Sequence, residues 1–147
     1  MRYMSENLTT RKRDDDPPSP TGDTFLSVPP NREAPGLARA FVKRRMRELG
    51  MPELTGDAAL VASEPVTNAA REQADHFPTE PIVVRLILTS QGRPRFEVTD
   101  CAPGSPRRRN VSSEAETGRG LALVSAVARR WDFARRPGGV KTVWAEL

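Results

Sequence analysis

The spacing of apolar residues predicts two helices in the first half of the chain. Between residues 34 and 49 apolar positions return every three or four residues, and Gly50 follows where a helix C-cap belongs. A second helix is expected from Leu54 to Ala74, with Thr55 as its N-cap. The first helix should bury Leu37, Ala40, Phe41 and Met46 or Leu49, opposite a charged side formed by Arg39, Lys43, Arg44, Arg47 and Glu48. We interpret that charged side as a solvated face rather than a nucleic-acid footprint.

Runs rich in β-branched or alternating apolar residues predict the strands. A third helix, with a glycine-rich start, is expected at residues 118–130, after a long loop at residues 101–117. The expected strands are Phe25–Val28, Ile82–Leu88, Arg95–Thr99, Trp131–Arg135 and Val140–Leu147. Two helices followed by hairpins predict an α+β fold. We expect a two-layer sandwich, with helices on one face of a mixed, mostly antiparallel sheet.

The composition indicates a disordered tail in addition to the folded part. The 147 residues suffice for one domain, but only 37% are hydrophobic and 14 are proline. Residues 1–23 combine charge blocks with Pro-Pro-Ser-Pro and bury too little apolar area to offset chain entropy. We therefore expect a disordered tail at 1–23 and one domain at 24–147. The net charge of +4 is mild for a nucleic-acid binder.

Cysteine and histidine usage excludes several classes of protein. Cys101 is the one cysteine, so no disulfide forms within the chain, and no apolar run is long enough for a membrane span or a secretion signal. A cytoplasmic location is expected. His76 is the one histidine, which disfavours histidine-rich metal sites and a Ser-His-Asp triad.

Three polar clusters stand at the ends of the expected elements. Glu64 and Asn68 lie four apart in "ASEPVTNAA", and Asp100 ends a strand in "VTDCAPGSP", with Gly104 following in the loop. The third cluster, "TGRGLALV", starts a helix with Gly118 and Gly120. Each cluster alone is weak, because caps, turns and solvated helix faces use the same residue types.

In this order the three clusters resemble the GHKL ATPase superfamily, which has the Bergerat, or histidine-kinase-like, ATPase fold. The likeness is strongest to the anti-sigma-factor serine kinases of the SpoIIAB and RsbW type and to their short bacterial ATP-binding relatives. It covers residues 24–147. "SEPVTNA" is similar to the N box, "VTDCAPGSP" to the first glycine box and "TGRGLALVSAVARRWD" to the second.

The resemblance implies a set of ligands and roles. It implies ATP and Mg²⁺ as cofactors, Asn68 as a magnesium ligand and Glu64 as the catalytic residue that orients or deprotonates the attacking group. Asp100 would accept a hydrogen bond from the adenine amino group. The other nucleotide contacts implied are Gly104, Gly118, Arg119, Gly120 and Thr142. The three residues from 118 to 120 would hold phosphates at a helix N-terminus.

Three positions depart from the family pattern. Ala102 replaces a glycine, Glu72 replaces a frequent histidine, and Pro65 lies between Glu64 and Asn68. An interior proline loses a backbone hydrogen bond at a cost of about 3 kcal/mol. Either Ser63 starts a new helix there or one helix continues with a kink, and both outcomes threaten the alignment of Glu64 with Asn68.

Two main hypotheses follow. The first is a kinase that transfers the γ-phosphate of ATP to a serine of an anti-anti-sigma, STAS-like partner, holds a sigma factor and forms a homodimer. The second is a nucleotide-binding, partner-switching module with little or no turnover, which Pro65 and Glu72 favour. A DNA-binding protein is the third and weakest hypothesis, because no helix-turn-helix pattern or concentrated basic stripe is present.

Overall fold

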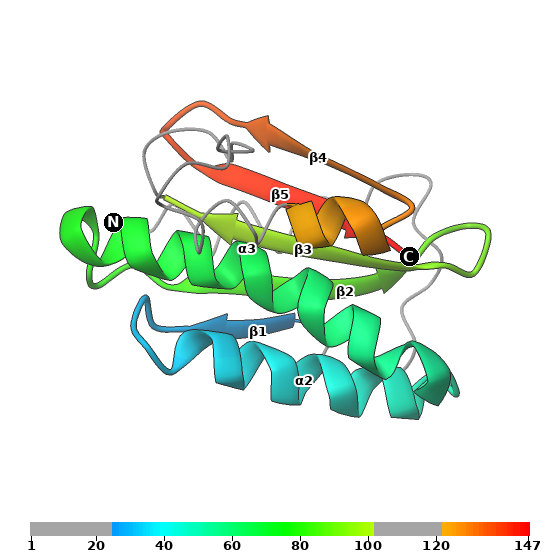
Figure 1. Cartoon of the computed structure of the whole chain (residues 1–147). Coiled ribbons are helices and arrows are strands. Elements are labelled where there is room, and N and C mark those ends of the chain that lie inside the picture. The colour runs from blue at the N-terminus through cyan, green and yellow to red at the C-terminus, as the bar shows by residue number, and fades with distance from the viewer. Residues whose placement is uncertain (1–24, 102–121) are drawn as a thin grey trace.

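A computed structural model describes residues 25–101 and 122–147 of the chain (Figure 1). The element order expected from the sequence is confirmed within these ranges, and residues 122–127 are helical before β4 begins. The tail predicted at residues 1–23 and most of the predicted loop lie outside the described residues. The elements are β1 (Phe25–Val28), α2 (Ala34–Glu48), the 3₁₀ turn η1 (Pro52–Leu54), α3 (Thr55–His76), β2 (Ile82–Leu88), β3 (Pro94–Asp100), β4 (Arg130–Arg135) and β5 (Lys141–Glu146).

The five described strands form one sheet in the order β1-β2-β3-β5-β4. Every pairing between them is antiparallel, so the expected mixed sheet is antiparallel throughout the described part of the chain. β5 returns between β3 and β4, which places Asp100 opposite Lys141 and Thr99 opposite Thr142. This register brings the end of β3 beside the start of β5.

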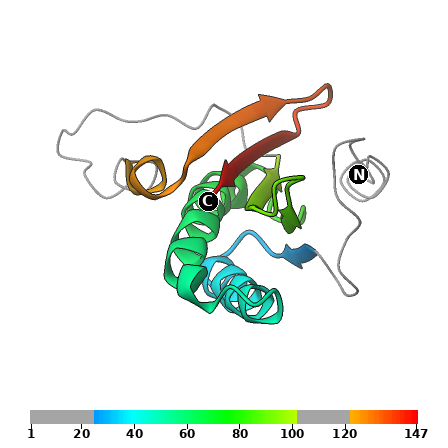
Figure 2. The ribbon, with the colours of Figure 1, turned by 90° about the vertical axis from the view of Figure 1, so that its right-hand side faces the viewer.

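The helices α2, α3 and 122–127 cover one face of the sheet, here called the helix face (Figure 2). Side chains from both layers close a single core there, in which Phe96, Val98 and Ala145 of the sheet meet Val61, Ala62 and Val66 of α3. The opposite, outer face carries the alternate residues of each strand. The predicted two-layer α+β sandwich is thus confirmed.

The apolar stripe of α2 differs from the predicted one. Its buried residues are Ala34, Ala38, Phe41, Val42, Arg45 and Met46. Leu37 is 45% exposed and Ala40 is exposed, so those two predictions are wrong. Small alanines face the fold instead of leucine, because they leave room for α2 to pack closely against α3.

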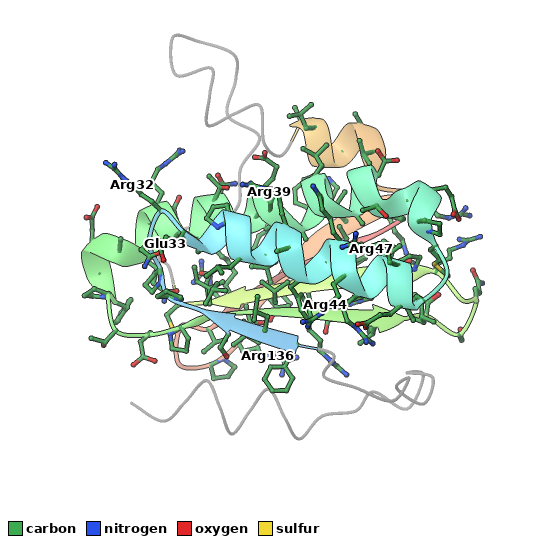
Figure 3. The ribbon with its side chains drawn as sticks, turned by 90° about the horizontal axis from the view of Figure 1, so that it is seen from below. Arg32, Glu33, Arg39, Arg44, Arg47 and Arg136 are labelled. Carbon is green, nitrogen blue, oxygen red and sulfur yellow. The ribbon has the colours of Figure 1, made fainter. Side chains whose placement is uncertain are left out.

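The charged side of α2 is exposed, as the periodicity predicts. Figure 3 shows Arg39, Arg44 and Arg47 projecting from the helix, and all three are exposed. Arg45 is the exception, because it is buried and pairs with Glu48 in the next turn.

α3 is one helix from Thr55 to His76, with Pro65 inside it. Of the two alternatives left open at Pro65, the helix continues and no new helix starts at Ser63. The predicted N-cap at Thr55 is wrong, because Leu54 is the residue that precedes the helix, without a side-chain cap. Pro65 is buried, and the Thr67 hydroxyl donates to the Ser63 carbonyl at 2.9 Å beside it. Burial of the ring offsets part of the lost backbone hydrogen bond.

Candidate functional site

Glu64, Asn68 and Glu72 follow one another at intervals of four residues along α3. Because the helix is continuous through Pro65, this spacing stacks the three side chains in one row. Each is partly exposed, whereas Pro65 and Ala69 beside them are buried in the core. The row therefore lies at the margin between the helix layer and solvent, where its two carboxylates and its amide remain accessible.

Asp100 is the last residue of β3 and is only 1% exposed. Strand alternation places it on the helix face with Phe96 and Val98, which belong to the core. Lys141, its partner in register, extends to the same face, and its ammonium Nζ lies 3.6 Å from the Asp100 carboxylate. A buried charge is thereby compensated by a buried counterion.

Gln73 joins α3 to this end of the sheet. Its side chain is fully buried, and its amide oxygen accepts a hydrogen bond from the backbone N–H of Cys101 at 2.9 Å. Its amide nitrogen donates to the carbonyl of Glu80, just before β2. Both ends of the amide are thus used to fix α3, which carries Asn68, against the strand end that carries Asp100.

Gln73 was missed by the sequence analysis, although its signal was present. It occupies a core position of α3 four residues after Ala69, where an apolar residue is expected. A polar amide at such a position indicates a buried hydrogen-bonding task.

Thr142 does not lie on the face of the sheet that Asp100 and Lys141 share. It is opposite Thr99 in register, and the two hydroxyls are 3.0 Å apart on the outer face of the sheet. The residue that the structure places across from Asp100 is Lys141, one position earlier. A role for Thr142 in adenine binding stays a prediction, without support from contact to Asp100.

Cys101 follows Asp100 and is partly buried. Burial, with the nearby carboxylates of Glu80 and Asp100, raises the pKa of the Cys101 thiol. A raised pKa keeps the less reactive thiol form, so the structure favours the packing role expected for this residue over a redox role.

The remaining predicted contacts cannot be placed. Gly104, Gly118, Arg119 and Gly120 lie outside the described residues. Within residues 25–101 and 122–147, no group of three or more His, Cys, Asp or Glu side chains is arranged to hold a metal.

Solved structures share the fold. The crystal structure of the RsbU and RsbW domains of Rv1364c from Mycobacterium tuberculosis is similar with a TM-score of 0.66 at 21% identity, over 86% of this chain and 32% of that one. The present chain thus spans about a third of that relative. The SiaB–SiaC complex from Pseudomonas aeruginosa matches with a TM-score of 0.60 at 13% identity, over 84% of this chain and 88% of that one. At these identities the likeness establishes the fold.

No curated protein matches the chain. No helix in the described ranges is long and apolar enough to cross a membrane. The pattern that defines the histidine kinase-like ATPase domain matches residues 28–145, which contain every described element except the first residues of β1 and the last of β5. Such a domain implies ATP as its ligand. Because this match covers most of the chain, the chain belongs to the family of histidine kinase-like ATPase domains.

Proposed function

We propose that this protein is an ATP-dependent serine kinase of a partner-switching pair, which phosphorylates a serine of an anti-anti-sigma, STAS-like protein. One observation carries the proposal: α3 continues unbroken through Pro65, so Glu64 and Asn68 keep the four-residue spacing that stacks them. The proline that argued against turnover does not divide the two residues on which turnover depends.

The described residues fit the chemistry of this reaction. Asp100, at the buried end of β3, offers carboxylate oxygens to the adenine amino group. Asn68 offers an amide oxygen to Mg²⁺, which when bound would neutralise charge on the phosphates. Glu64 lies one turn before Asn68 and accepts the proton of the attacking serine hydroxyl. Gln73 holds the helix and the strand end in a fixed relation.

The partners are inferred from the neighbours. One neighbour contains an RsbW domain beside an RsbU domain, and the other is a SiaB–SiaC complex. We propose an anti-anti-sigma protein as the phosphoacceptor, a sigma factor as a second partner, a homodimer as the working form and the cytoplasm as the location. The exposed basic side of α2 is available for contact with such partners.

Calorimetric titration with ATP and magnesium, followed by a phosphotransfer assay with candidate STAS-like proteins, tests the proposal. Glu64→Gln should lower transfer by about 100-fold or more while leaving ATP affinity within about twofold, because general-base catalysis contributes on that scale. Asn68→Ala should weaken binding of Mg-ATP itself. Glu53→Gln, at an exposed position on η1, is the matched control and should change neither. Absence of any binding at millimolar ATP would overturn the proposal.

A second candidate function is a nucleotide-binding, partner-switching module with little or no turnover. Glu72 favours it, because this second carboxylate stands one turn after Asn68 in the same row. Measurable ATP affinity without phosphotransfer to any partner, in both wild type and Glu72→Gln, would select this function over the kinase. Transfer that appears only in Glu72→Gln would identify Glu72 as the inhibiting group.

A further inference from the structure

The outer face of the sheet is buried at its centre, although the described helices lie on the other face (Figure 2). We propose that this face is the docking surface of the chain's own N-terminal segment, residues 1–24, which joins the sheet at Phe25. The inference goes beyond the proposed function, because it concerns the face opposite Asp100 and does not depend on ATP binding.

Exposure along one row of the outer face falls toward the middle of the sheet. The row follows the register across all five described strands and consists of Ser27, Val83, Thr99, Thr142 and Ala134. Its two end residues are exposed, whereas Thr99 and Thr142 in the middle are 2% and 6% exposed. Threonine is mostly an exposed residue type, so two buried threonines on a face without a described helix indicate a cover from elsewhere in the chain.

The ion pairs of the outer face do not account for this burial. They enclose Glu97 and Glu146, which both contact Arg95. The threonine hydroxyls instead bond each other, 3.0 Å apart. Val83 and Trp144 lie next to the threonines on the same face and are each partly exposed, so the face also offers apolar contact.

Position and length select the N-terminal segment as the cover. Phe25 is the first residue of the edge strand β1, projects to the outer face and is 47% exposed. Residues 1–24 therefore begin at the margin of this face. Five strands about 4.8 Å apart span roughly 19 Å, a distance that about six extended residues cross. The segment can reach every strand, and its covalent tether gives it an effective concentration on the order of millimolar.

The sequence of the segment supplies side chains that match the face. Its apolar residues gather near its start, at Met1, Tyr3, Met4 and Leu8. The segment is too polar to fold alone, and a surface that is already formed provides the apolar contact that it lacks. These side chains dock against Val83 and Trp144, and the backbone that carries them covers the threonine row.

Acrylamide quenching of tryptophan fluorescence tests the cover, because Trp144 lies on the outer face. Trp131→Phe in the full chain leaves Trp144 as the one tryptophan. In that background, Tyr3→Ala, Met4→Ala and Leu8→Ala together should raise the quenching constant of Trp144. The docking equilibrium constant should fall about tenfold or more for each apolar side chain lost.

A matched control changes the polar residues of the same segment. Ser5→Ala, Thr9→Ala and Thr10→Ala together should leave the quenching of Trp144 unchanged. A second measurement keeps both tryptophans and the whole segment: trypsin should cut within residues 11–13 several-fold faster in Val83→Ser than in wild type, because the docked segment is protected. This measurement decides the question if Trp131→Phe does not fold.

Two results would overturn the inference. One is equal quenching in the parent, the apolar variant and the control, together with equal trypsin cleavage in wild type and Val83→Ser. The other is protection of Trp144 that disappears on dilution but not on substitution of the segment, because a second copy of the chain would then be the cover. Neither result bears on the proposed function, which ATP calorimetry tests separately.

Discussion

Two buried carboxylates stand at opposite ends of the β3–β5 ladder, and their surroundings differ. Asp100, at one end, projects to the helix face and is paired with Lys141, whose side chain is as buried as its own. Glu146, at the other end, projects to the outer face and is paired with Arg95 at 3.3 Å and with Arg130 at 2.7 Å. The two carboxylates share burial, strand pairing and a cationic partner.

The two ends of the ladder differ in the other contacts that their cations make. Arg95 and Arg130 form directional hydrogen bonds to Glu146, and both guanidinium groups lie over the ring of Trp144. Arg95 also contacts Glu97, so the outer-face network closes on itself. Lys141 is held near Asp100 at ion-pair distance on the helix face. One end of the ladder is thus a network in which two guanidinium groups share a carboxylate and an indole ring, and the other end is a buried carboxylate beside a buried ammonium.

The largest expected effect comes from removing Asp100. Asp100→Ala leaves the Lys141 ammonium buried without its carboxylate, which should cost about 3–5 kcal/mol in the free energy of unfolding. Nucleotide binding should be lost as well. Urea unfolding of the nucleotide-free protein and ATP calorimetry measure the two effects.

A paired replacement is the control for that experiment. Asp100→Asn combined with Lys141→Met removes both charges and should recover most of the lost stability, because uncharged buried groups of similar size need no counterion. ATP affinity should stay low. A single Asp100→Ala variant that loses less than about 1 kcal/mol would mean that the pair is not buried in solution as it is here.

Glu146→Gln should have a smaller effect and no functional one. It weakens charged hydrogen bonds to Arg95 and Arg130, but the Arg130 side chain is 64% exposed and solvent screens that contact. We expect a loss of about 1–2 kcal/mol in the free energy of unfolding. ATP affinity should stay within about twofold of wild type, since this end of the ladder is remote from Asp100. A large drop in affinity would contradict the division of roles between the two ends.

The pH dependence of stability sharpens the same comparison. The hydrogen bond from Arg130, with the charges of Arg130 and Arg95, lowers the pKa of Glu146 below its ordinary value of 4.5. The pKa of Glu146 is lower in the folded state than in the unfolded state. The stabilisation by its ionised carboxylate is therefore fully present above pH 4.5 and is lost as the pH falls through the folded-state pKa. The stability gap between wild type and Glu146→Gln should therefore be constant from about pH 7 to 5 and narrow below 4.5. A gap that widens under acid would contradict the sign of the shift.

Periodicity predicted most of the fold because both layers follow simple patterns. The strands around Val84 and Val98 alternate as pleated surfaces require, and α3 carries an apolar stripe long enough to outweigh one interior proline. In the stripe predicted for α2, Phe41 and Met46 are buried, whereas Leu37 and Ala40 are exposed. Close helix packing instead selects the small residues Ala34 and Ala38.

The site was less predictable, for a reason specific to sheets. Motif spacing placed Glu64 and Asn68 on a helix and Asp100 at a strand end, and the structure has them there, since each position depends on one element alone. The partner of Asp100 depends on the register between β3 and β5, and a shift of one residue moves a side chain to the opposite face. The sequence analysis named Thr142 from the family resemblance, and the pairing places Thr142 opposite Thr99 and Lys141 opposite Asp100. The buried position of Gln73 on α3 could be predicted from the apolar spacing, but its partner, the Cys101 N–H, depends on how α3 packs on the sheet.

The smallest expected effect concerns the aromatic centre of the outer-face network. The guanidinium carbon of Arg95 lies 4.2 Å from the centre of the Trp144 ring, within the range of a cation–π contact. A double-mutant cycle with Arg95→Met and Trp144→Leu should give a coupling of about 0.5–1 kcal/mol, because the losses that each residue makes with other partners cancel in the cycle. Urea unfolding of the four proteins supplies the coupling. A value near zero would show that Glu146, rather than Trp144, holds Arg95 in place, and the outer-face network would then reduce to its ion pairs.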